Sequence, residues 1–373
     1  MQGGDNQSGI QADMIEPGIL CDRQIRAAHD AGWILAACAL DADQVQPASL
    51  DLRLGAVAYR VRASFLPGPF ASVADRIAAL RLHEIDLSRG AVLETGCVYI
   101  VPLLESLALP RDIEGSANPK SSTGRLDIFT RLITDRARAF DTIAGGYHGP
   151  LYLEVSPRTF PILVRTGSRL SQIRFRHGDA RLGDPALAAL QRIAPLTDGE
   201  ASIANGLLVS IDLEGKGGIV GYRAKRHTDV IDVDQRAALD SLDFWEPIPR
   251  RGRAELILDP DQFYILVSRE AVHVPPDHAA EMVAFDPLVG EFRVHYAGFF
   301  DPGFGHGAAG GAGSRAVLEV RSHEVPFILE HGQFVGRLVY ERMSAPPDIL
   351  YGAGAGSNYQ AQGLKLSKHF RPV

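Results

Sequence analysis

The stretch GPLYLEV, residues 149–155, decides the fold because SRAVLEV, residues 314–320, repeats its last three letters 165 positions later. Single residues around both stretches match at the same offset: Tyr99 and Tyr264, Pro110 and Pro275, Asp112 and Asp277, Pro161 and Pro326, Gly167 and Gly332. Solenoid repeats are several times shorter than this period. The sequence therefore predicts two tandem domains of one fold.

The sequence of each copy predicts mainly short β-strands. Runs such as CVYIVPLLE (97–105) and QFYILVS (262–268) are rich in β-branched and aromatic residues and are bounded by Pro, Gly and Asp, as in a sandwich or small barrel. Residues 21–32 and 184–194 have apolar residues at helical spacing. We predict a mainly β protein with a few short helices, divided as follows: 1–17 disordered tail, 18–195 first domain, 196–205 linker, 206–373 second domain.

Composition limits the class of function. The chain of 373 residues carries a formal net charge of −7, which argues against a general nucleic-acid or membrane-surface binder. Its three cysteines, Cys21, Cys38 and Cys97, are widely spaced, as expected in a reducing compartment and unlike a metal site. With no signal peptide and no long apolar run, we predict a cytoplasmic protein.

The two copies differ in two loops, and each keeps what the other lacks. PKSSTGRL (119–126) stands opposite AFDPLVGE (284–291), which has none of its cationic or hydroxyl side chains. YAGFFDPGF (296–304) stands opposite RLITDRARA (131–139). The first loop of copy one suits a polyphosphate, through an ammonium, two hydroxyls and a guanidinium. This reciprocal loss predicts one composite site made from loops of both copies, although each loop alone is compatible with a plain surface role.

The loop of copy two has the character of a pocket wall. Pro302 and Gly303 predict a tight turn, and Ala297 and Gly298 would let a flat ligand reach the main chain. Strand alternation turns Glu319 away from the face that Leu318 and Val320 share. Buried there, its carboxyl would have a raised pKa and suit a general base, a role worth roughly 10²–10⁴-fold in rate. An exposed glutamate at a sheet edge is the alternative.

These residues resemble the dCTP deaminases of the dUTPase-like superfamily. GILCDRQIRAAHDAGWI (18–34) resembles the N-terminal helix of that family and QPASLDLRLG (46–55) its first strand. PKSSTGRL resembles its phosphate loop, YAGFFDPGF followed by LEV its base-pocket hairpin, and YGAGAGSNYQAQG (351–363) its closing C-terminal segment. The resemblance implies two dUTPase-like β-barrel or sandwich domains and deamination of dCTP to dUTP and ammonia without zinc.

The resemblance also implies roles for individual residues. Glu319 would be the general base, with Glu154, its counterpart in copy one, as second choice. The residues expected to bind substrate are Lys120, Ser121, Ser122 and Arg125 at the triphosphate with Mg²⁺, Ala297 and Asp301 at the base, and Tyr351, Tyr359 and Gln362 in the closing segment. Asn358 replaces the usual lysine before Tyr359, which puts one phosphate contact in doubt.

Other readings stay open at this point. A bifunctional enzyme that carries dCTP to dUMP, or a plain dUTPase, would use Asp301 as the base for pyrophosphate cleavage. A non-catalytic deoxynucleotide sensor would keep the pocket without turnover. The resemblance implies dCTP and dUTP as ligands, dTTP as an inhibitor, and a homo-oligomer such as a trimer, and the tandem arrangement is also compatible with a monomer like the two-domain herpesvirus dUTPases.

Overall fold

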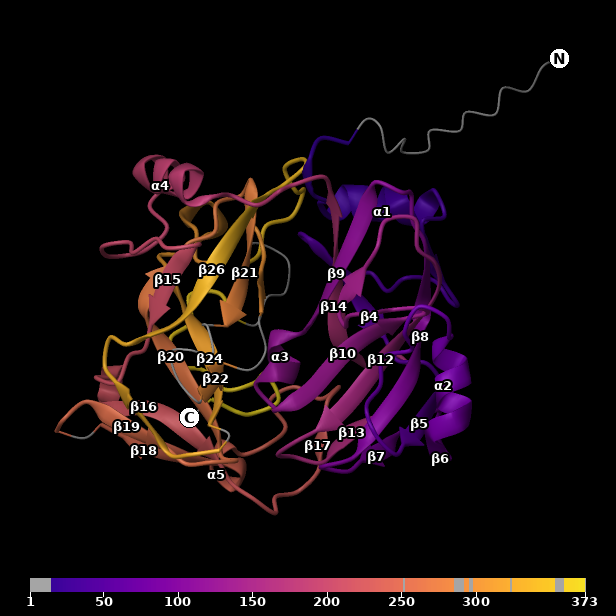
Figure 1. Cartoon of the computed structure of the whole chain (residues 1–373). Coiled ribbons are helices and arrows are strands. Elements are labelled where there is room, and N and C mark those ends of the chain that lie inside the picture. Colours follow the sequence, from indigo (N-terminus) through magenta and orange to yellow (C-terminus); the bar gives the residue numbers. More distant parts are fainter. Residues whose placement is uncertain are drawn as a thin grey trace.

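The computed structural model describes residues 15–250, 252–284, 292–294, 298–322, 324–352 and 359–372, with backbone alone at 216, 284 and 292–294. Two halves built mainly of strands lie side by side, the first coloured indigo to magenta and the second orange to yellow (Figure 1). The prediction of a mainly β chain with two tandem domains is confirmed.

The first half holds two sheets. One runs in the order β11 (Thr142–Ile143), β9 (Ile113–Pro119), β14 (Arg169–His177), β4 (Ser49–Arg53), β3 (Val45–Gln46), with β1 (Gly18–Ile19) also on β14. The other runs β10 (Ile128–Thr134), β12 (His148–Pro157), β8 (Val98–Ala108), β5 (Val57–Val61), β6 (Arg81–Asp86), with β2 (Ile34–Ala36) also on β8. A ribbon of β7 (Ala91–Leu93) and β13 (Ile162–Val164) completes this half.

The second half repeats this order. Its first sheet runs β15 (Leu207–Ser210), β26 (Phe334–Arg342), β21 (His278–Ala284), β23 (Phe299–Phe300). Its second sheet runs β18 (Trp245–Pro249), β16 (Ile219–Ala224), β20 (Phe263–Val272), β24 (Ser314–Ser322), β22 (Phe292–Val294). Its ribbon is β19 (Glu255–Leu258) with β25 (Phe327–Glu330), while β17 (Ile231–Asp232) joins the ribbon of the first half.

The repeat extends to individual hydrogen bonds. Strands β8, β9 and β14 begin at 98, 113 and 169, and β20, β21 and β26 begin at 263, 278 and 334, each 165 residues later. The hydroxyl of Tyr99 accepts a hydrogen bond from the Glu94 N–H at 3.0 Å, and the hydroxyl of Tyr264 accepts one from the Asp259 N–H at 3.0 Å. The offset read from the sequence is therefore a repeat of tertiary structure.

The helices are short and lie at the edges of the sheets: α1 (Asp22–Asp30), α2 (Val73–Leu80), α3 (Ser121–Gly124), α4 (Asp184–Ile193) and α5 (Ser241–Phe244). Helix α1 buries Ile25 and Ala28 and ends before Gly32, whose φ of +77° favours glycine. Helices α1 and α4 match the two predicted helices, 21–32 and 184–194. Helix α2 was not predicted, although Ser72 caps it by accepting a hydrogen bond from the Asp75 N–H at 3.0 Å.

The boundaries of the predicted first domain need correction at both ends. Ile15 packs into the core of the first half, so the predicted tail, 1–17, extends too far; residues 1–14 lie outside the described residues. Leu182 and Leu187 pack into the core of the second half, so α4 belongs there and not to a first domain ending at 195. The small and polar residues at 196–205 gave a linker signal, but the burial of apolar side chains decides the boundary.

The two halves share part of one core. Phe160 of the first half packs edge-on against Phe244 and Trp245 of the second, with ring centroids 5.7 and 5.4 Å apart. Phe370, near the C-terminus, packs on Trp245 at 6.0 Å. Burying large aromatic side chains across this contact fixes the position of one half against the other. Loops of both halves are thereby held around the space between them.

Candidate active site

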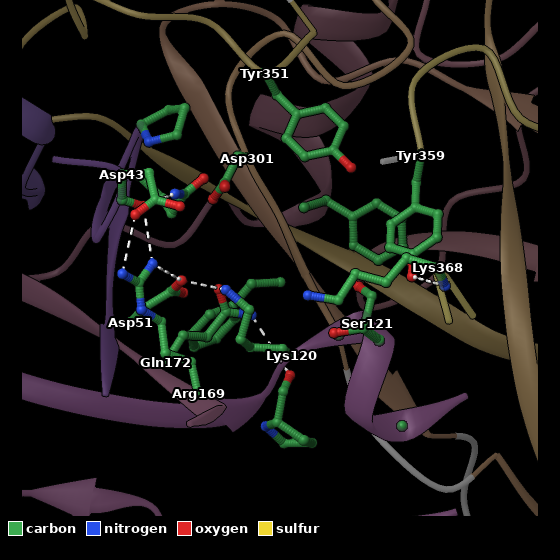
Figure 2. Close-up of a pocket in the computed structure, with 18 of the residues that line it drawn as sticks. Asp43, Asp51, Lys120, Ser121, Arg169, Gln172, Asp301, Tyr351, Tyr359 and Lys368 are labelled. Atoms are coloured by element: carbon green, nitrogen blue, oxygen red, sulfur yellow. Dashed lines mark hydrogen bonds and ion pairs between the residues drawn. The ribbon is translucent and has the colours of Figure 1, made fainter. Parts of the chain in front are cut away.

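A cavity of about 750 Å³ lies between the two halves. Figure 2 shows side chains of both halves around it. The residues that line it and carry the argument are Lys120, Ser121, Ser122, Arg125, Arg169 and Gln172 from the first half, and Phe300, Asp301, Glu319, Tyr351, Tyr359, Gln362 and Lys368 from the second. Its size suits a small organic ligand. The structure thus brings together the loops expected to form a composite site.

Glu319 occupies the inner wall of this cavity. On β24 its neighbours Leu318 and Val320 point into the core, and Glu319 points to the opposite face, where it is only 6% exposed. Burial raises the pKa of its carboxyl to about 8, and the positive charge of Arg125 offsets this only in part. The Arg125 Nε atom lies 4.0 Å from the Glu319 Oε1 atom. Near neutral pH this carboxyl holds its proton.

Arg125 joins the first half to the C-terminal segment. It follows α3, and its guanidinium donates hydrogen bonds to the Lys365 carbonyl at 2.9 Å and to the Gln362 Oε1 atom at 3.0 Å. The same guanidinium lies over the ring of Tyr359, 3.8 Å from the ring centre. The sequence predicted a triphosphate ligand here, and that stays a prediction. In this structure Arg125 binds the closing segment and stands beside Glu319.

The loop expected to bind phosphate surrounds the short helix α3. Lys120 immediately precedes this helix, and its ammonium pairs with the buried carboxylate of Asp51. Ser121 is half-buried at the cavity, whereas Ser122 is buried and its carbonyl accepts a hydrogen bond from the Ser367 hydroxyl at 2.8 Å. The loop is therefore tied to the C-terminal segment at one end and to the first sheet at the other.

Further cationic side chains at the cavity were missed by sequence reasoning. Lys368 lies on the wall near Ser121 (Figure 2), and burial together with the nearby Lys120 lowers the pKa of its ammonium to about 8. Arg169 lines the same wall and forms ion pairs with Asp41 and Asp43. Neither Lys368 nor Arg169 lies in a loop that distinguishes the two copies, so no local sequence pattern predicts either as a site residue. Both lie at the cavity because of the tertiary fold.

The hairpin of copy two forms the opposite wall. The Phe304 N–H donates to the Asp301 carbonyl at 3.1 Å and Gly303 has a φ of +93°, so Pro302 and Gly303 form the predicted tight turn. The Asp301 carboxylate accepts a hydrogen bond at 2.8 Å from Arg174, a buried residue of the first half. Ala297 lies outside the described residues, and its neighbour Gly298 lines the cavity.

The described part of the closing segment lines the cavity. The Tyr351 N–H donates to the Pro302 carbonyl at 2.8 Å, and the Tyr351 ring packs on Phe304 at 5.5 Å. The hydroxyl of Tyr359 accepts a hydrogen bond from the Lys368 N–H at 3.1 Å. Residues 353–358, and with them Asn358, lie outside the described residues.

Glu154, the second choice as base, does not line the cavity. It occupies the register position of Glu319, because Glu154 pairs with Ile100 as Glu319 pairs with Ile265. Arg131 donates two hydrogen bonds to its Oε1 atom, at 2.7 and 3.0 Å. A carboxylate held in this way is a structural ion pair. Among the residues described, no group of three or more His, Cys, Asp and Glu side chains is placed to hold a metal ion.

Comparison with known proteins agrees with this geometry. Residues 16–179 match the family model of the 2′-deoxycytidine 5′-triphosphate deaminase (DCD) N-terminal domain, and residues 183–370 match that of its C-terminal domain. The chain belongs to the 2′-deoxycytidine 5′-triphosphate deaminase family. The two matches meet near residue 180, where the packing of α4 also divides the halves.

Some relatives in this deaminase family match most of the chain, and others match less than half of it. The crystal structure of 2′-deoxycytidine 5′-triphosphate deaminase from Agrobacterium tumefaciens is 68% identical, covers 88% of this chain and 99% of that chain, and superposes with a TM-score of 0.85. A "dCTP deaminase, dUMP-forming" from Beutenbergia cavernae is 32% identical over 45% of this chain and 82% of its own. A dCTP deaminase from Shewanella amazonensis is 31% identical over 42% of this chain and 81% of its own.

The described residues include no helix with the length and apolar character needed to span a bilayer.

Proposed function

We propose that this chain hydrolyses dCTP to dUTP and ammonia in the cavity between its halves, with Glu319 as the group that moves protons. The single observation that carries the proposal is a buried carboxyl of raised pKa in a cavity whose facing wall, from the other half, holds Lys120, Arg125 and Arg169 beside the carboxylates of Asp41, Asp43 and Asp51. Such a cavity suits a ligand with an uncharged base at one end and phosphates at the other.

The raised pKa of Glu319 fits both proton transfers that deamination requires. Protonated near pH 7, its carboxyl donates to N3 of cytosine, which makes C4 more electrophilic. The resulting carboxylate takes a proton from water as the water oxygen bonds to C4, and this proton then passes to the amino group. The C4–N bond breaks and ammonia leaves, and the hydroxyl group on C4 returns its proton to the Glu319 carboxylate, which forms the C4 carbonyl of uracil and restores the protonated carboxyl. Arg125, 4.0 Å away, stabilises the carboxylate stage.

The triphosphate is proposed to bind along the cationic wall. Lys120 and Lys368 would face it with Ser121, Ser122 and Arg169. Burial and, after it, the charge of Lys120 lower the pKa of Lys368 to about 8, and a bound polyanion would favour its charged form. Lys120 must exchange the Asp51 carboxylate for phosphate, so Asp51 holds it in place until substrate arrives. Mg²⁺ would arrive with the triphosphate as part of the substrate.

The base is proposed to bind at the hairpin. Main-chain groups of Ala297 and Gly298 would contact the cytosine, and the pair between Arg174 and Asp301 would keep the hairpin at its distance from the first half. Tyr351, Tyr359 and Gln362 would close over the nucleotide. We further propose that both domains are dUTPase-like barrels, that the protein works in the cytoplasm without zinc, and that dTTP inhibits it by occupying the same cavity.

A second candidate is a bifunctional enzyme that continues to dUMP. It is favoured by the relatives named as dUMP-forming and by the carboxylate of Asp301 in the same cavity as Glu319. The bond between Asp301 and Arg174 argues that this carboxylate is structural, because a general base must be able to take a proton.

Incubation of the purified chain with dCTP and Mg²⁺, with quantification of all products, tests these proposals. Equal amounts of ammonia and dUTP support deamination alone. Ammonia with dUMP and pyrophosphate supports the bifunctional candidate, and dUTP hydrolysis without any ammonia from dCTP supports a plain dUTPase. Binding of dCTP without products would contradict an enzyme and support a sensor.

A further inference from the structure

A strand of the second half, β17, pairs with the β7–β13 ribbon of the first half. The second half has a corresponding ribbon, β19–β25. Strand β17 pairs in parallel with β13: the Ile231 N–H donates to the Pro161 carbonyl at 3.0 Å, and the Val233 N–H donates to the Leu163 carbonyl at 3.2 Å. Both Ile231 and Val233 are buried by this contact. In Figure 1 the three strands β7, β13 and β17 lie together at the bottom, where the halves meet.

The ribbon of the second half repeats the same pairing without the third strand. Ile257 lies opposite Ile328 as Val92 lies opposite Leu163, each pair separated by the 165-residue offset. Among the residues described, no strand pairs with β25 on its other side. Ile257 and Ile328 are each 54% exposed, whereas Val92 is 37% exposed and Leu163 is half-buried. The ribbon of the second half therefore exposes more apolar surface than its counterpart in the first half.

The first half in turn exposes the counterpart of the covering segment. Tyr59 and Tyr222 hold the same position, opposite Ile100 and Ile265 on the neighbouring strand. Phe70 lies eleven residues after Tyr59, and Val233 lies eleven residues after Tyr222, so the two hold the same position in their halves. Val233 is 6% exposed and Phe70 is 97% exposed. Phe70 therefore exposes to water a position whose counterpart in the second half is buried.

The charges of the two surfaces are complementary. In the covered ribbon, Arg165 binds Asp232 and Asp234 of the covering segment. At the same position in the second half the chain has Glu330, which lies directly opposite Glu255 across the ribbon. Two like charges in this arrangement destabilise a ribbon unless a cation lies against them. Arg62 is exposed in the connection that carries Phe70.

We propose that the β19–β25 ribbon of one chain binds the connection between β5 and α2 of a second copy of the same chain. Phe70 of one copy packs on Ile257 and Ile328 of the other, and Arg62 lies against Glu255 and Glu330. Side chains rather than an added strand make the contact, because the Gly68 N–H, at the position of Ile231, already donates to the Ala137 carbonyl at 3.1 Å. The contact joins two different surfaces and is therefore head-to-tail.

Sedimentation velocity of the full-length protein over a range of concentrations tests this contact. The wild type should sediment as species heavier than the 40.3 kDa chain. Phe70→Asp and Ile328→Asp should each weaken association at least about tenfold, because each places a carboxylate in the apolar centre of the contact. Ile193→Asp is the matched control: Ile193 is 83% exposed on α4, away from both surfaces, and its substitution should leave association unchanged.

A mixture of the two variants gives the sharpest result. Phe70→Asp keeps an intact ribbon and Ile328→Asp keeps an intact Phe70, so an equimolar mixture should form a species of two chains and nothing larger. A mixture that stays monomeric would contradict the head-to-tail contact. A wild type of 40.3 kDa at every concentration would also contradict it, as would variants that associate as the wild type does.

Discussion

Glu154 and Glu319 occupy the same position in two copies of one fold, and their surroundings separate them. Both are buried and both pair with an isoleucine of the neighbouring strand. Arg131, from the same half, binds Glu154 directly, whereas Arg125, which faces Glu319, comes from the other half, and its Nε atom lies 4.0 Å from the Glu319 Oε1 atom. The repeat thus places two carboxyl groups at one position of the fold: Glu154, bound by an arginine of its own half, and Glu319, which faces an arginine of the other half.

The largest effect expected from this contrast is on turnover. Glu319→Gln keeps the shape of the side chain but cannot accept or donate the proton that deamination moves. We expect kcat for ammonia release from dCTP to fall by roughly 10²–10⁴-fold, with little change in KM. A steady-state assay of ammonia measures this. A variant that retained the wild-type rate would remove Glu319 from the mechanism.

Glu154→Gln should have the converse effect. It leaves the guanidinium of Arg131 without its carboxylate, and breaking a buried pair costs about 3–5 kcal/mol of the free energy of unfolding. Urea denaturation should show this loss, while kcat stays within about twofold of the wild type. The double variant Glu154→Gln with Arg131→Gln should recover part of the stability. Loss of turnover in a folded Glu154→Gln protein would mean a second site in the first half.

The stability of the protein should also depend on pH through Glu319. Its pKa is raised from 4.5 to about 8 on folding, so stability is highest while the group is protonated in both states and falls as pH rises from 4.5 towards 8. The loss should reach a few kcal/mol at most. Glu319→Gln should be more stable than the wild type at alkaline pH, and the difference in Tm between them should grow up to about pH 8. A constant difference in Tm would show that the Glu319 pKa is not raised.

Arg125 belongs to the first half and faces Glu319 of the second half. We expect its substitution to have the smallest effect on turnover. Arg125→Lys keeps the charge but loses the fork of hydrogen bonds to Gln362 and the Lys365 carbonyl and the stacking on Tyr359. We expect kcat/KM for dCTP to fall about tenfold, about 1.4 kcal/mol. Arg131→Lys is the matched control in the first half, where kcat/KM should not change. Equal losses in both variants would point to a general loss of folding.

The repeat and the loops that distinguish its copies were visible in the sequence, and so was the side of β24 to which Glu319 points. These features are local or periodic, which is why they could be predicted. Lys368 lies at the cavity because of the path of the C-terminal segment, and Arg169 because β14 begins there. Such placement depends on contacts between distant parts of the chain, and no local sequence pattern predicts it. The assignment of α4 to the second half also could not be predicted, because it depends on which of the two cores buries Leu187.

The role of Arg125 shows a different limit. Its residue type and its loop indicate a phosphate ligand, which stays a prediction, whereas the hydrogen bonds of its guanidinium to the C-terminal segment were not indicated by the sequence. A cation with several donors fits either partner, so residue type alone does not choose between them.

If the two halves form one site per chain, each chain binds one dCTP, and the stoichiometry of binding measures this. Isothermal titration of Glu319→Gln with dCTP and Mg²⁺ avoids turnover while keeping the cavity. We expect one dCTP bound per chain. Two molecules of dCTP bound per chain with similar affinity would contradict it, because the first half would then hold a complete site of its own.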